Sequence, residues 1–490
     1  MELKSILLGL NGIKAKGNLE VDINNIQNVS ENVSEGDMFV AIKGYEKNGN
    51  DYIEEAIKKG ARAIMAQDDI DKNIIKQIPE DVTIILVPDT RHALAIAACN
   101  YYSNPSRKFK LIGVTGTKGK TTTTYMIKNI LEKNGTKVGL IGTIANYIGS
   151  TKLPESARTT PESLELQKIF YKMAEEKCEV VVMEVSSQSL KLSRVDGCDF
   201  DIGLFTNISE DHISEKEHEC IEEYFATKIQ LFKMCKLGYI NSDDVYVSKI
   251  PKLIQGCEFK TFGIDNPANL LAKDITVTNT SVDFKVKLGE RNERVKVGIP
   301  GRFSVYNALA AISVCLNLGA NSETIKEALL NIKVPGRSEL VENDKDLTIM
   351  LDYAHTPESL ENILTTVKAY TKGKVICVFG CGGDRDKNKR KIMGEISGRL
   401  ADYTIITSDN PRTEKPEIII DEIEEGIKKI KANYECIVDR KEAIKKAIEM
   451  ARRNDMVLIA GKGHELTQEI NGEEFPFDER KIVKDILENR

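Results

Sequence analysis

The sequence predicts an α/β protein of three domains, in which a doubly wound, mostly parallel central sheet is flanked by a small N-terminal α/β domain and a C-terminal Rossmann-like α/β domain. The first observation is length, because 490 residues exceed what one hydrophobic core usually organises. The second is that short apolar runs, typical of buried strands, alternate with helix-like segments. The third is a pair of turn-forming segments, which predict domains at 1–107, 108–335 and 336–490.

Composition and charge indicate a globular protein and argue against several kinds of binding partner. The apolar content of 41% and charged content of 29% are those of a globular protein. A formal charge of −6 argues against general affinity for nucleic acid or anionic membranes. The ten cysteines lack metal-site spacing, and no apolar run approaches the roughly 20 residues of a membrane helix. We therefore expect a cytoplasmic protein with reduced thiols, no membrane insertion and no nucleic-acid partner.

The N-terminal domain is predicted from apolar runs that alternate with polar helices. These runs lie at Met38 to Ile42, Ala61 to Ala66 and Thr83 to Val87, and the pattern ends in the turn-forming segment Tyr102 to Pro105.

The central domain begins with a βαβ unit. The run Lys110 to Val114 enters a Gly/Thr-rich loop, a helix from about Thr121 ends near Gly135, and a strand follows at Val138 to Ile141. Further apolar runs at 180–183 and 202–205 end in polar residues, as parallel strands do at the sheet edge where ligands bind. Function should therefore lie at those strand ends.

The third part of the chain is predicted to form a second open α/β sheet. Before it come a β-alternating segment from Val282 to Leu288 and a helix near Asn307 to Leu318, and the segment Val334 to Arg337 marks the boundary. The predicted strands are 348–351, 375–379, 404–407 and 457–460.

The loop Thr115-Gly-Thr-Lys-Gly-Lys-Thr-Thr122 follows a predicted strand and opens a helix, the setting of a phosphate-binding P-loop. Lys120 would neutralise the β- and γ-phosphates, and Thr121 would bind Mg²⁺. The spacing departs from the common GxxxxGK[ST] form, because Val114 stands where the first Gly would fall. A plain Gly/Thr turn is the alternative. The predicted phosphate contacts are Gly116, Thr117, Lys118, Gly119, Lys120, Thr121 and Thr122.

This loop resembles that of the Mur ligases and of their folylpolyglutamate synthetase relatives, and the resemblance covers nearly the whole chain. The further matching segments, in chain order, are Met183-Glu-Val-Ser-Ser187, Thr206-Asn-Ile-Ser-Glu-Asp-His212, Tyr306-Asn307, Pro335-Gly-Arg337, Asp352-Tyr-Ala-His-Thr-Pro357, Gly380-Cys-Gly-Gly-Asp-Arg-Asp386, Asp409-Asn-Pro-Arg412 and Gly461-Lys-Gly-His-Glu465.

The resemblance implies an ATP- and Mg²⁺-dependent ligase that activates a carboxylate as an acyl phosphate, which an amine then attacks. It places Lys120, Glu184, His212 and Lys228 in catalysis, and Thr121, Glu184, His212 and a carbamylated Lys228 at Mg²⁺. A strand-end Glu is usually a solvated cap, a lone His is usually structural, and a Lys is usually a surface side chain. A regulatory nucleotide-binding protein that has lost turnover would be expected to lack Lys120, Glu184, His212 or Lys228, and all four of these are present.

Other nucleotide contacts are implied from the resemblance alone. Asn307 matches an adenine contact, while Arg337 and Asp352 match nucleotide contacts that domain closure would bring to the site. Alternatively, Asp352 and His355 could cap a helix that begins near Thr356.

The resemblance also implies a muramyl dipeptide substrate, UDP-MurNAc-L-Ala-D-Glu, within peptidoglycan precursor synthesis and hence cell-wall biogenesis, cell shape, cell cycle and cell division. The chain departs from the usual family residues at Glu31, Gln188 and Leu192. The matching substrate positions are Ser30, Thr159, Thr160, Ser186 and Arg194.

The segment Asp409-Asn-Pro-Arg412 indicates which amino acid the ligase would add. A planar guanidinium can grip the distal carboxylate of meso-diaminopimelate in bidentate fashion, whereas L-lysine presents only an ammonium there, so Arg412 favours meso-diaminopimelate. The alternatives are the same reaction with L-lysine, a folylpolyglutamate synthetase-like ligase, or an Arg412 that merely pairs with an internal acid. We expect a monomer. The implied amino-acid contacts are Arg385, Asp409, Asn410, Pro411, Arg412, Gly461 and Glu465, with Glu465 suited to the distal ammonium.

Overall fold

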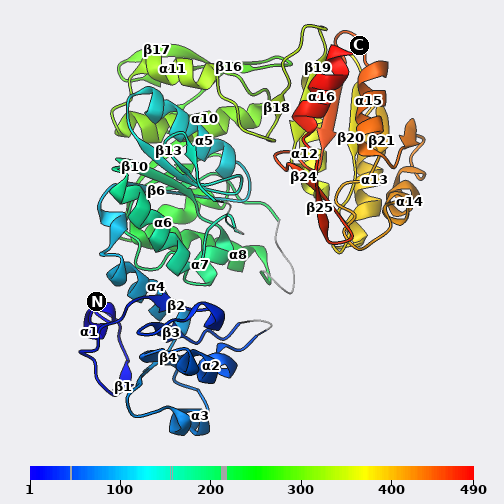
Figure 1. Cartoon of the computed structure of the whole chain (residues 1–490). Helices are drawn as coiled ribbons and strands as arrows, with labels where there is room; N and C mark the ends of the chain where they lie inside the picture. The colour runs from blue at the N-terminus through cyan, green and yellow to red at the C-terminus, as the bar shows by residue number, and fades with distance from the viewer. Residues whose placement is uncertain (45–46, 155, 157, 211–217, 490) are drawn as a thin grey trace. The chain divides into compact units, whose positions relative to one another are not determined.

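The computed structural model describes residues 1–44, 47–154, 156, 158–210 and 218–489. The chain folds into two compact units, one made of Met1–Lys120 and Gly135–Thr261, the other of Thr121–Asn134 and Phe262–Arg490 (Figure 1). No helix among the residues so described is both long and apolar enough to span a membrane.

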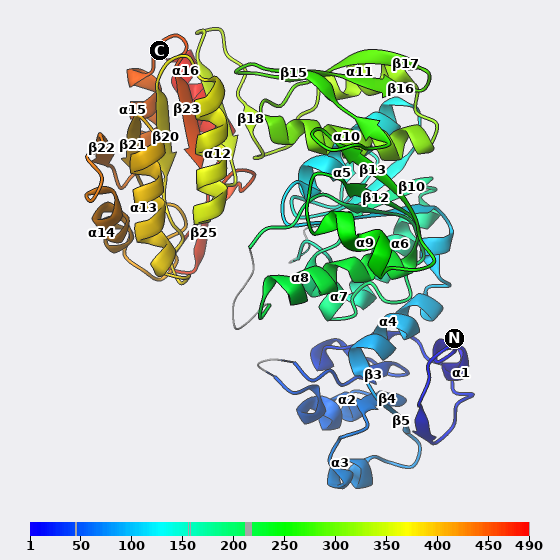
Figure 2. The ribbon, with the colours of Figure 1, turned by 180° about the vertical axis from the view of Figure 1, so that it is seen from behind.

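The N-terminal part of the first unit is a five-stranded sheet of β1 (Lys14–Lys16), β2 (Ile26–Gln27), β3 (Met38–Val40), β4 (Ala63–Gln67) and β5 (Thr83–Val87). Its order is β1-β5-β4-β3-β2, with β1 the antiparallel edge strand. The helices are α1 (Leu3–Ile6), α2 (Ile53–Lys58), α3 (Lys72–Gln77) and α4 (Thr90–Tyr101). Buried side chains of α1 and α4 pack in one apolar cluster and those of α2 in another, so that the sheet is covered on both faces (Figure 2).

The central sheet of the first unit contains β6 (Lys110–Thr115), β7 (Val138–Ile141), β8 (Tyr147–Ile148), β9 (Thr151–Lys152), β10 (Val180–Glu184), β11 (Phe200–Phe205) and β12 (Cys235–Asn241). These strands follow the order β12-β11-β6-β10-β7-β8-β9, and only β8 runs opposite to the others, so that the β7–β8 and β8–β9 pairs are antiparallel. The parallel strands are apolar and buried on both faces, which is why they appear in the sequence as short continuous hydrophobic runs. Because β6, β10 and β11 are parallel neighbours, their carboxyl ends meet at one sheet edge.

Helices α6 (Ser163–Glu175) and α8 (Ile221–Lys228) and the 3-10 helix η4 (Ile229–Met234) pack on the same face of this sheet. Leu166 and Phe170 of α6 lie in one apolar cluster there, while Phe225 of α8 and Phe232 of η4 pack with Phe205 in a second. Helix α7 (Ser187–Lys191) starts directly after β10. The remaining short elements of this unit are η1 (Ser30–Asn32), η2 (Gly49–Tyr52), η3 (Pro105–Arg107), η5 (Val247–Lys249) and α9 (Ile250–Leu253).

The second unit begins within α5 (Lys120–Lys133), at Thr121, and Asn129 of this helix donates through Nδ2 to the carbonyl of Ala328 at 3.1 Å. Around it lie α10 (Arg302–Asn317), α11 (Ser322–Leu330) and an antiparallel sheet of β15 (Lys273–Val277), β16 (Val282–Leu288) and β17 (Arg291–Val297). Strand β13 (Glu258–Gly263), which crosses the boundary between the units, pairs in parallel with β14 (Leu270–Leu271).

The C-terminal part of the second unit is a six-stranded sheet of β18 (Glu339–Leu340), β19 (Thr348–Asp352), β20 (Val375–Phe379), β21 (Tyr403–Ile406), β22 (Tyr434–Cys436) and β23 (Met456–Ala460). Its order is β18-β19-β23-β20-β21-β22, and only β18 is antiparallel. Helices α12 (Pro357–Tyr370), α13 (Asn388–Leu400) and α14 (Pro416–Ile427) pack on one face, and α15 (Arg440–Met450) and α16 (Glu479–Glu488) on the other (Figure 1). A hairpin, β24 (Thr467–Ile470) and β25 (Glu473–Pro476), follows β23.

The predicted strands are all present, with ends that differ by a few residues. The helix predicted from Asn307 begins earlier, at Arg302, directly after Gly301, whose φ of +97° ends the preceding segment. An extended apolar run is enough to locate a buried strand, whereas a helix start depends on this local backbone turn.

Candidate active site

The loop between β6 and α5 has a backbone that requires glycine. Gly116 has φ of +135° and Gly119 has φ of +86°, both in the left-handed region that side chains disfavour. A Cβ at Gly116 would also clash with the hydroxyl oxygen of Thr206. The predicted P-loop therefore closely approaches the end of β11, as a loop at a parallel strand edge should.

Asn207, just after β11, holds the loop in place. Its backbone carbonyl accepts from the amide of Thr117 at 2.8 Å, and its side-chain oxygen accepts from the amide of Lys118 at 3.0 Å. Its Nδ2 donates to the Lys118 carbonyl at 3.0 Å, and the Thr206 hydroxyl donates to the same carbonyl at 2.7 Å. Thr206 and Asn207 belong to the family-like segment Thr206 to His212, but the sequence did not predict their contact with the loop.

Two lysines meet at one carbonyl of the loop. Lys120 donates through Nζ to the carbonyls of Gly116 and Thr117, each at 2.9 Å, and Lys228 donates through Nζ to the Gly116 carbonyl at 2.9 Å. Lys228 is only 1% exposed and lies 4.5 Å above the ring of Tyr224. The structure thus brings together two of the predicted catalytic residues and concentrates positive charge at the loop, which suits a polyanionic ligand.

His218 steadies the helix that carries Lys228. Its Nδ1 lies 2.6 Å from Oε2 of Glu223 on α8, its Nε2 lies 2.9 Å from the hydroxyl of Ser187 on α7, and its ring packs at a tilt against that of Tyr224, with the ring centres 4.7 Å apart. Burial lowers the pKa of His218, which favours a neutral ring that donates to Glu223 and accepts from Ser187. The sequence contained no local signal for this contact.

Glu184 ends β10 as a fully buried carboxylate, and Thr143 of another loop donates two hydrogen bonds to it. Thr143 donates its amide to Oε1 and its hydroxyl to Oε2, both at 2.9 Å. A Cβ at Gly142 would clash with Oε1 of Glu184, so the chain needs glycine to approach the carboxylate this closely. Thr143 and Gly142 were both missed, because they lie after β7 and match no recognised motif.

The predicted muramyl contacts gather around Glu184. Thr159 lies 3.1 Å from Thr143, measured between their hydroxyl oxygens, and the Thr160 hydroxyl donates to the Glu184 carbonyl at 2.8 Å. The Ser186 amide donates to the Thr160 hydroxyl at 3.1 Å, and Arg194 donates to the Thr160 carbonyl at 3.3 Å. Ser186 also caps α7, and Arg194 pairs with Glu162 at 3.0 Å, so both have structural partners as well.

The groups predicted to hold Mg²⁺ fit that ion in chemistry. The Glu184 carboxylate and the Thr121 hydroxyl are hard oxygen donors, which Mg²⁺ prefers. Lys228 as an ammonium has no lone pair to offer, and carbamylation would supply oxygen ligands. His212 lies outside the described residues. Among the residues that are described, no three His, Cys, Asp or Glu side chains form a metal-binding group.

Ser30, predicted to contact the uridine-diphosphate part of the substrate, lies in η1 of the N-terminal part. Its hydroxyl donates to Oε2 of Glu55 at 2.8 Å, and its carbonyl accepts from Nζ of Lys59 at 3.2 Å. Ser30 is therefore hydrogen-bonded to Glu55 of α2 and to Lys59, the residue directly after that helix.

In the second unit, the predicted nucleotide contacts form two groups. Asn307 on α10 accepts at Oδ1 from the Thr123 hydroxyl of α5 at 3.5 Å. Arg337 lies with its guanidinium 4.7 Å above the ring of Tyr353, and Asp352 accepts from the Ser338 amide at 2.8 Å. Burial raises the pKa of the Asp352 carboxyl, while the charge of Arg337 acts in the opposite direction.

The alternative that Asp352 and His355 cap a helix is wrong. Helix α12 is capped by Thr356, which forms a capping box with Ser359. His355 instead is exposed and lies with Nδ1 2.7 Å from the Tyr353 carbonyl. The Thr356 hydroxyl, directly before the first residue of α12, can reach the free amides of the first turn, whereas Asp352 and His355 lie further upstream.

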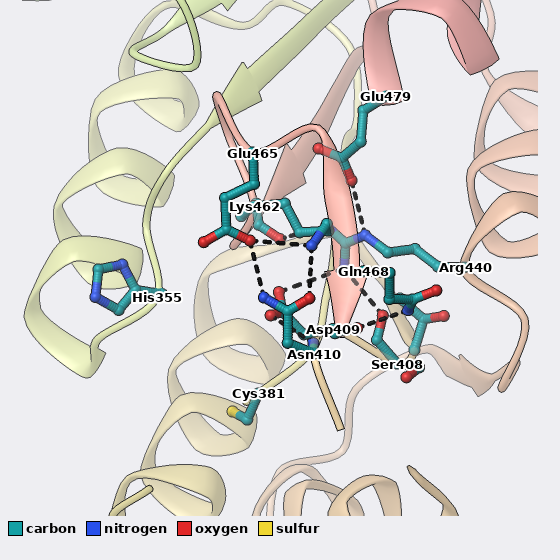
Figure 3. Close-up of polar contacts among 12 residues, drawn as sticks. His355, Cys381, Ser408, Asp409, Asn410, Arg440, Lys462, Glu465, Gln468 and Glu479 are labelled. Carbon is teal, nitrogen blue, oxygen red and sulfur yellow. Dashed lines mark hydrogen bonds and ion pairs between the residues drawn. The ribbon is translucent and has the colours of Figure 1, made fainter. Parts of the chain in front are cut away.

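The C-terminal candidate site is a polar network between the ends of β21 and β23 (Figure 3). Asn410 is its hub, because its Nδ2 donates to Oε2 of Glu465 at 2.8 Å and its Oδ1 accepts from Nζ of Lys462 at 2.8 Å. Lys462, which is fully buried, also donates to Glu465 at 3.0 Å. Asp409 and Gly461 lie so close that a Cβ on the glycine would meet Oδ2 of the carboxylate. The structure therefore brings together four of the predicted amino-acid contacts.

A buried ion pair ties the two strand ends together. Arg440 donates through Nε to Oε1 of Glu479 at 2.7 Å, and both side chains are fully buried. The same guanidinium donates to the Ala460 carbonyl at 2.9 Å and to the Ser408 carbonyl at 3.4 Å (Figure 3). These two residues were not predicted, because α15 and α16 carry no recognised motif.

Arg412 is partly engaged with the protein itself. It donates through Nε to Oε2 of Glu469 at 2.9 Å and through Nη1 to the Gly383 carbonyl at 2.8 Å. The expected alternative, in which Arg412 pairs with an acid of the protein itself, therefore holds for its Nε, which is bonded to Glu469. Gly382 leaves room for the guanidinium, since a Cβ there would lie 2.9 Å from Nη1. Arg385, in the same loop, is exposed.

Comparison with known proteins identifies the family. Residues 22–102 match the Mur ligase family catalytic domain, residues 114–315 the Mur ligase middle domain, and residues 336–463 the Mur ligase glutamate ligase domain. A protein of Caldanaerobacter subterraneus named UDP-N-acetylmuramoyl-L-alanyl-D-glutamate–2,6-diaminopimelate ligase is 49% identical, over 98% of each chain. The chain belongs to the Mur ligase family.

Further comparisons extend the family assignment to the fold. A protein of the same name from Clostridium perfringens is 47% identical to this Mur ligase over the whole of both chains. A solved structure of a ligase with that name superimposes with a TM-score of 0.73 at 28% identity, covering 100% of this chain and 99% of the other. The predicted three-domain α/β fold class is confirmed.

Proposed function

We propose that this Mur ligase uses ATP to join meso-diaminopimelate to the γ-carboxylate of D-Glu in UDP-MurNAc-L-Ala-D-Glu. The observation that carries the proposal is the whole-length similarity to relatives, 49% and 47% identical, that are named for this ligase activity. The fold alone would not suffice, because a folylpolyglutamate synthase from Thermotoga maritima shares it with a TM-score of 0.59 at 19% identity. The proposal places the reaction in the cytoplasm, where ATP is available.

The phosphate loop and its lysines support the activation step. A carboxylate is a poor electrophile, so the γ-phosphoryl group must move to it before an amine can attack. In the proposal, Lys120 exchanges its loop carbonyls for phosphate oxygens and Gly116 to Thr122 surround the phosphates. Thr121, Glu184, His212 and a carbamylated Lys228 would hold Mg²⁺, which neutralises phosphate charge when bound.

The remaining groups hold the two organic substrates and the nucleotide base. Thr159, Thr160, Ser186 and Arg194, which surround Glu184, would contact the muramyl dipeptide, and Ser30 the uridine-diphosphate part. Asn307, Arg337 and Asp352 would contact ATP. An adjacent Arg194 guanidinium suits the carboxylates of the D-Glu residue.

The C-terminal network supports the choice of amino acid. The Arg412 side chain is 21% exposed, so a ligand can reach it, and the Nη2 edge of its guanidinium can bind the distal carboxylate of meso-diaminopimelate. Glu465, fixed by Asn410 and Lys462, would accept from the distal ammonium. L-Lysine lacks the carboxylate and would leave the guanidinium without a partner.

The test is ATP-dependent phosphate release with UDP-MurNAc-L-Ala-D-Glu and each candidate amino acid. We expect turnover with meso-diaminopimelate, and at least a hundredfold lower kcat/KM with L-lysine, because hydrogen bonds between Arg412 and a carboxylate are worth about 1.5–3 kcal/mol and L-lysine forms none of them. Arg412→Ala should remove this preference and leave ATP binding intact. Arg399→Ala, which removes an exposed arginine paired with Glu361, is the matched control. Equal or better use of L-lysine by the wild-type protein would contradict the proposal.

A further inference from the structure

The hairpin β24–β25 lies beyond residue 463, where the match to the glutamate ligase domain ends. None of the recognised motifs includes it. Its first strand nevertheless contacts the loop of Asp409 to Arg412, which the proposed function assigns to the incoming amino acid. The contacts are of three kinds, and they involve the backbone of Arg412, the residues before it and its guanidinium group.

The backbone of the hairpin holds Arg412 from both sides. The Arg412 amide donates to the Glu469 carbonyl at 3.1 Å, and the Arg412 carbonyl accepts from the Asn471 amide at 2.7 Å. Arg412 has φ of +51°, a left-handed conformation that is uncommon for a side chain of this size. Because both of its backbone groups are bonded to the hairpin, this conformation is stabilised by tertiary contacts.

The hairpin also orders the residues that precede Arg412. Gln468 donates through Nε2 to the Asp409 carbonyl at 2.6 Å, and the Glu469 amide donates to Oδ1 of Asn410 at 3.1 Å (Figure 3). With Lys462 on the same oxygen, Asn410 has no freedom to flip. The amino-acid loop is thus attached to β24 along its length.

The third contact acts on the guanidinium itself. Glu469 accepts from Nε of Arg412 at 2.9 Å, and the Gly383 carbonyl accepts from Nη1 at 2.8 Å. Two acceptors on two different edges fix the plane of a guanidinium, because its donors lie in a rigid fork. The Nη2 edge is then presented in one orientation.

We propose that Glu469 is a positioning residue that determines specificity, by holding the Arg412 guanidinium ready for the distal carboxylate of the amino-acid substrate. The proposal rests on the proposed function, since it assumes that Arg412 reads that carboxylate. Glu469 acts through Arg412 and need not contact the substrate. Its side chain is 37% exposed, so replacing it should cost little stability, as for other exposed ion pairs.

The test compares Glu469→Ala, Glu469→Gln and the wild-type full chain with meso-diaminopimelate and with L-lysine. In Glu469→Ala we expect the KM for meso-diaminopimelate to rise about tenfold, with the KM for ATP and kcat unchanged, because the guanidinium must be ordered on binding. Use of L-lysine should not change. Glu469→Gln, which keeps an oxygen acceptor for Nε, should restore most of the affinity.

The matched control is Glu474→Ala, which removes the same charge from the residue opposite Glu469 in the hairpin. It should behave as wild type. A lower KM for meso-diaminopimelate in Glu469→Ala would overturn the proposal, because Glu469 would then compete with the substrate carboxylate for Arg412. Equal losses for all substrates, or equal effects of both variants, would overturn it in favour of a structural role.

The outcomes also separate this inference from the proposed function. A wild-type protein that prefers meso-diaminopimelate, together with a Glu469→Ala variant that keeps the same preference and KM, leaves the function intact and overturns only the role of Glu469. A wild-type protein that makes no product with meso-diaminopimelate overturns both.

Discussion

Thr143 donates two hydrogen bonds to the carboxylate of Glu184, one from its amide to Oε1 and one from its hydroxyl to Oε2, each at 2.9 Å. The carboxylate is fully buried and ends a strand beside the phosphate loop. Hydrogen bonds that fix a metal-binding carboxylate also orient it toward the ion. Thr143 therefore links the geometry of the sheet edge to the proposed Mg²⁺ site.

The hydroxyl of Thr143 can be removed without a change of shape. Thr143→Val should lower kcat roughly tenfold to a hundredfold and raise the Mg²⁺ concentration needed for half-maximal activity, because a charge-assisted hydrogen bond is lost. Thr143→Ser, which retains the hydroxyl, should stay within a few-fold of wild type. Steady-state rates across a Mg²⁺ titration measure both effects. A Thr143→Val variant with an unchanged Mg²⁺ requirement would argue against this role.

Lys228 should need carbon dioxide to act as an oxygen ligand. The side chain is buried, with its ammonium on the Gly116 carbonyl, and only a carbamate would give it oxygen donors. We expect activity to fall in CO₂-depleted buffer and to return when bicarbonate is added. Lys228→Ala should be at least a hundredfold less active.

The control for this prediction is the response of the variant to bicarbonate. Lys228→Ala should not respond, since it has no amine to carbamylate. Full wild-type activity after rigorous removal of CO₂ would show that the lysine works as an ammonium.

Asn207 should control nucleotide affinity through the loop. Its side chain bonds the amide and the carbonyl of Lys118, both at 3.0 Å, and so fixes the backbone that is proposed to surround the phosphates. Asn207→Ala should raise the KM for ATP about tenfold, because the loop must then be ordered on binding. Asn207→Asp keeps an oxygen acceptor for the Lys118 amide, so its KM for ATP should lie between those of the wild type and of Asn207→Ala. A rise in the KM for the amino acid, with ATP unaffected, would contradict the assignment of this loop.

The stability of the C-terminal part should depend on pH through Glu414. Hydrogen bonds from the buried Arg390 guanidinium lower the pKa of Glu414 from 4.5 to about 2. Between these values the unfolded state binds the proton more readily, so the free energy of unfolding falls as pH drops through this window. The full contribution, present above pH 4.5, is about 2 kcal/mol after allowance for solvent screening.

Hydrogen exchange in α13 and α14, which pack together around Arg390, measures this dependence. Glu414→Gln should show lower protection than wild type at pH 6, and the difference should shrink as the pH approaches 3.5. A difference in protection that stays constant over this range would mean that Glu414 contributes through something other than its charge.

Much of the fold could be predicted because its signals are local. Buried parallel strands appear as short apolar runs, as β10 and β20 do, and their polar ends indicate the functional edge of each sheet. The P-loop could be predicted from glycines at positions that need positive φ, such as Gly116. The same loop pattern indicated Lys120, whereas Lys228 was implied only by the resemblance to the Mur ligases, and the two side chains meet at one carbonyl.

What could not be predicted depends on contacts between distant parts of the chain. Thr143 lies 41 residues from Glu184, Glu469 lies 57 residues from Arg412, and Arg440 lies 39 residues from Glu479. Each residue is ordinary in its own local sequence, and only packing makes it a partner. Substrate contacts and domain boundaries likewise stay predictions, since a single sequence does not specify them.

The transfer of an oxygen atom tests the central claim most directly, namely that ATP activates the D-Glu carboxylate as an acyl phosphate. UDP-MurNAc-L-Ala-D-Glu labelled with ¹⁸O in the γ-carboxylate is turned over with ATP and meso-diaminopimelate, and the released phosphate is analysed by mass spectrometry. The account predicts one ¹⁸O atom in each phosphate, because amine attack expels the carboxylate oxygen with the phosphoryl group. Unlabelled phosphate released together with tripeptide product would contradict it.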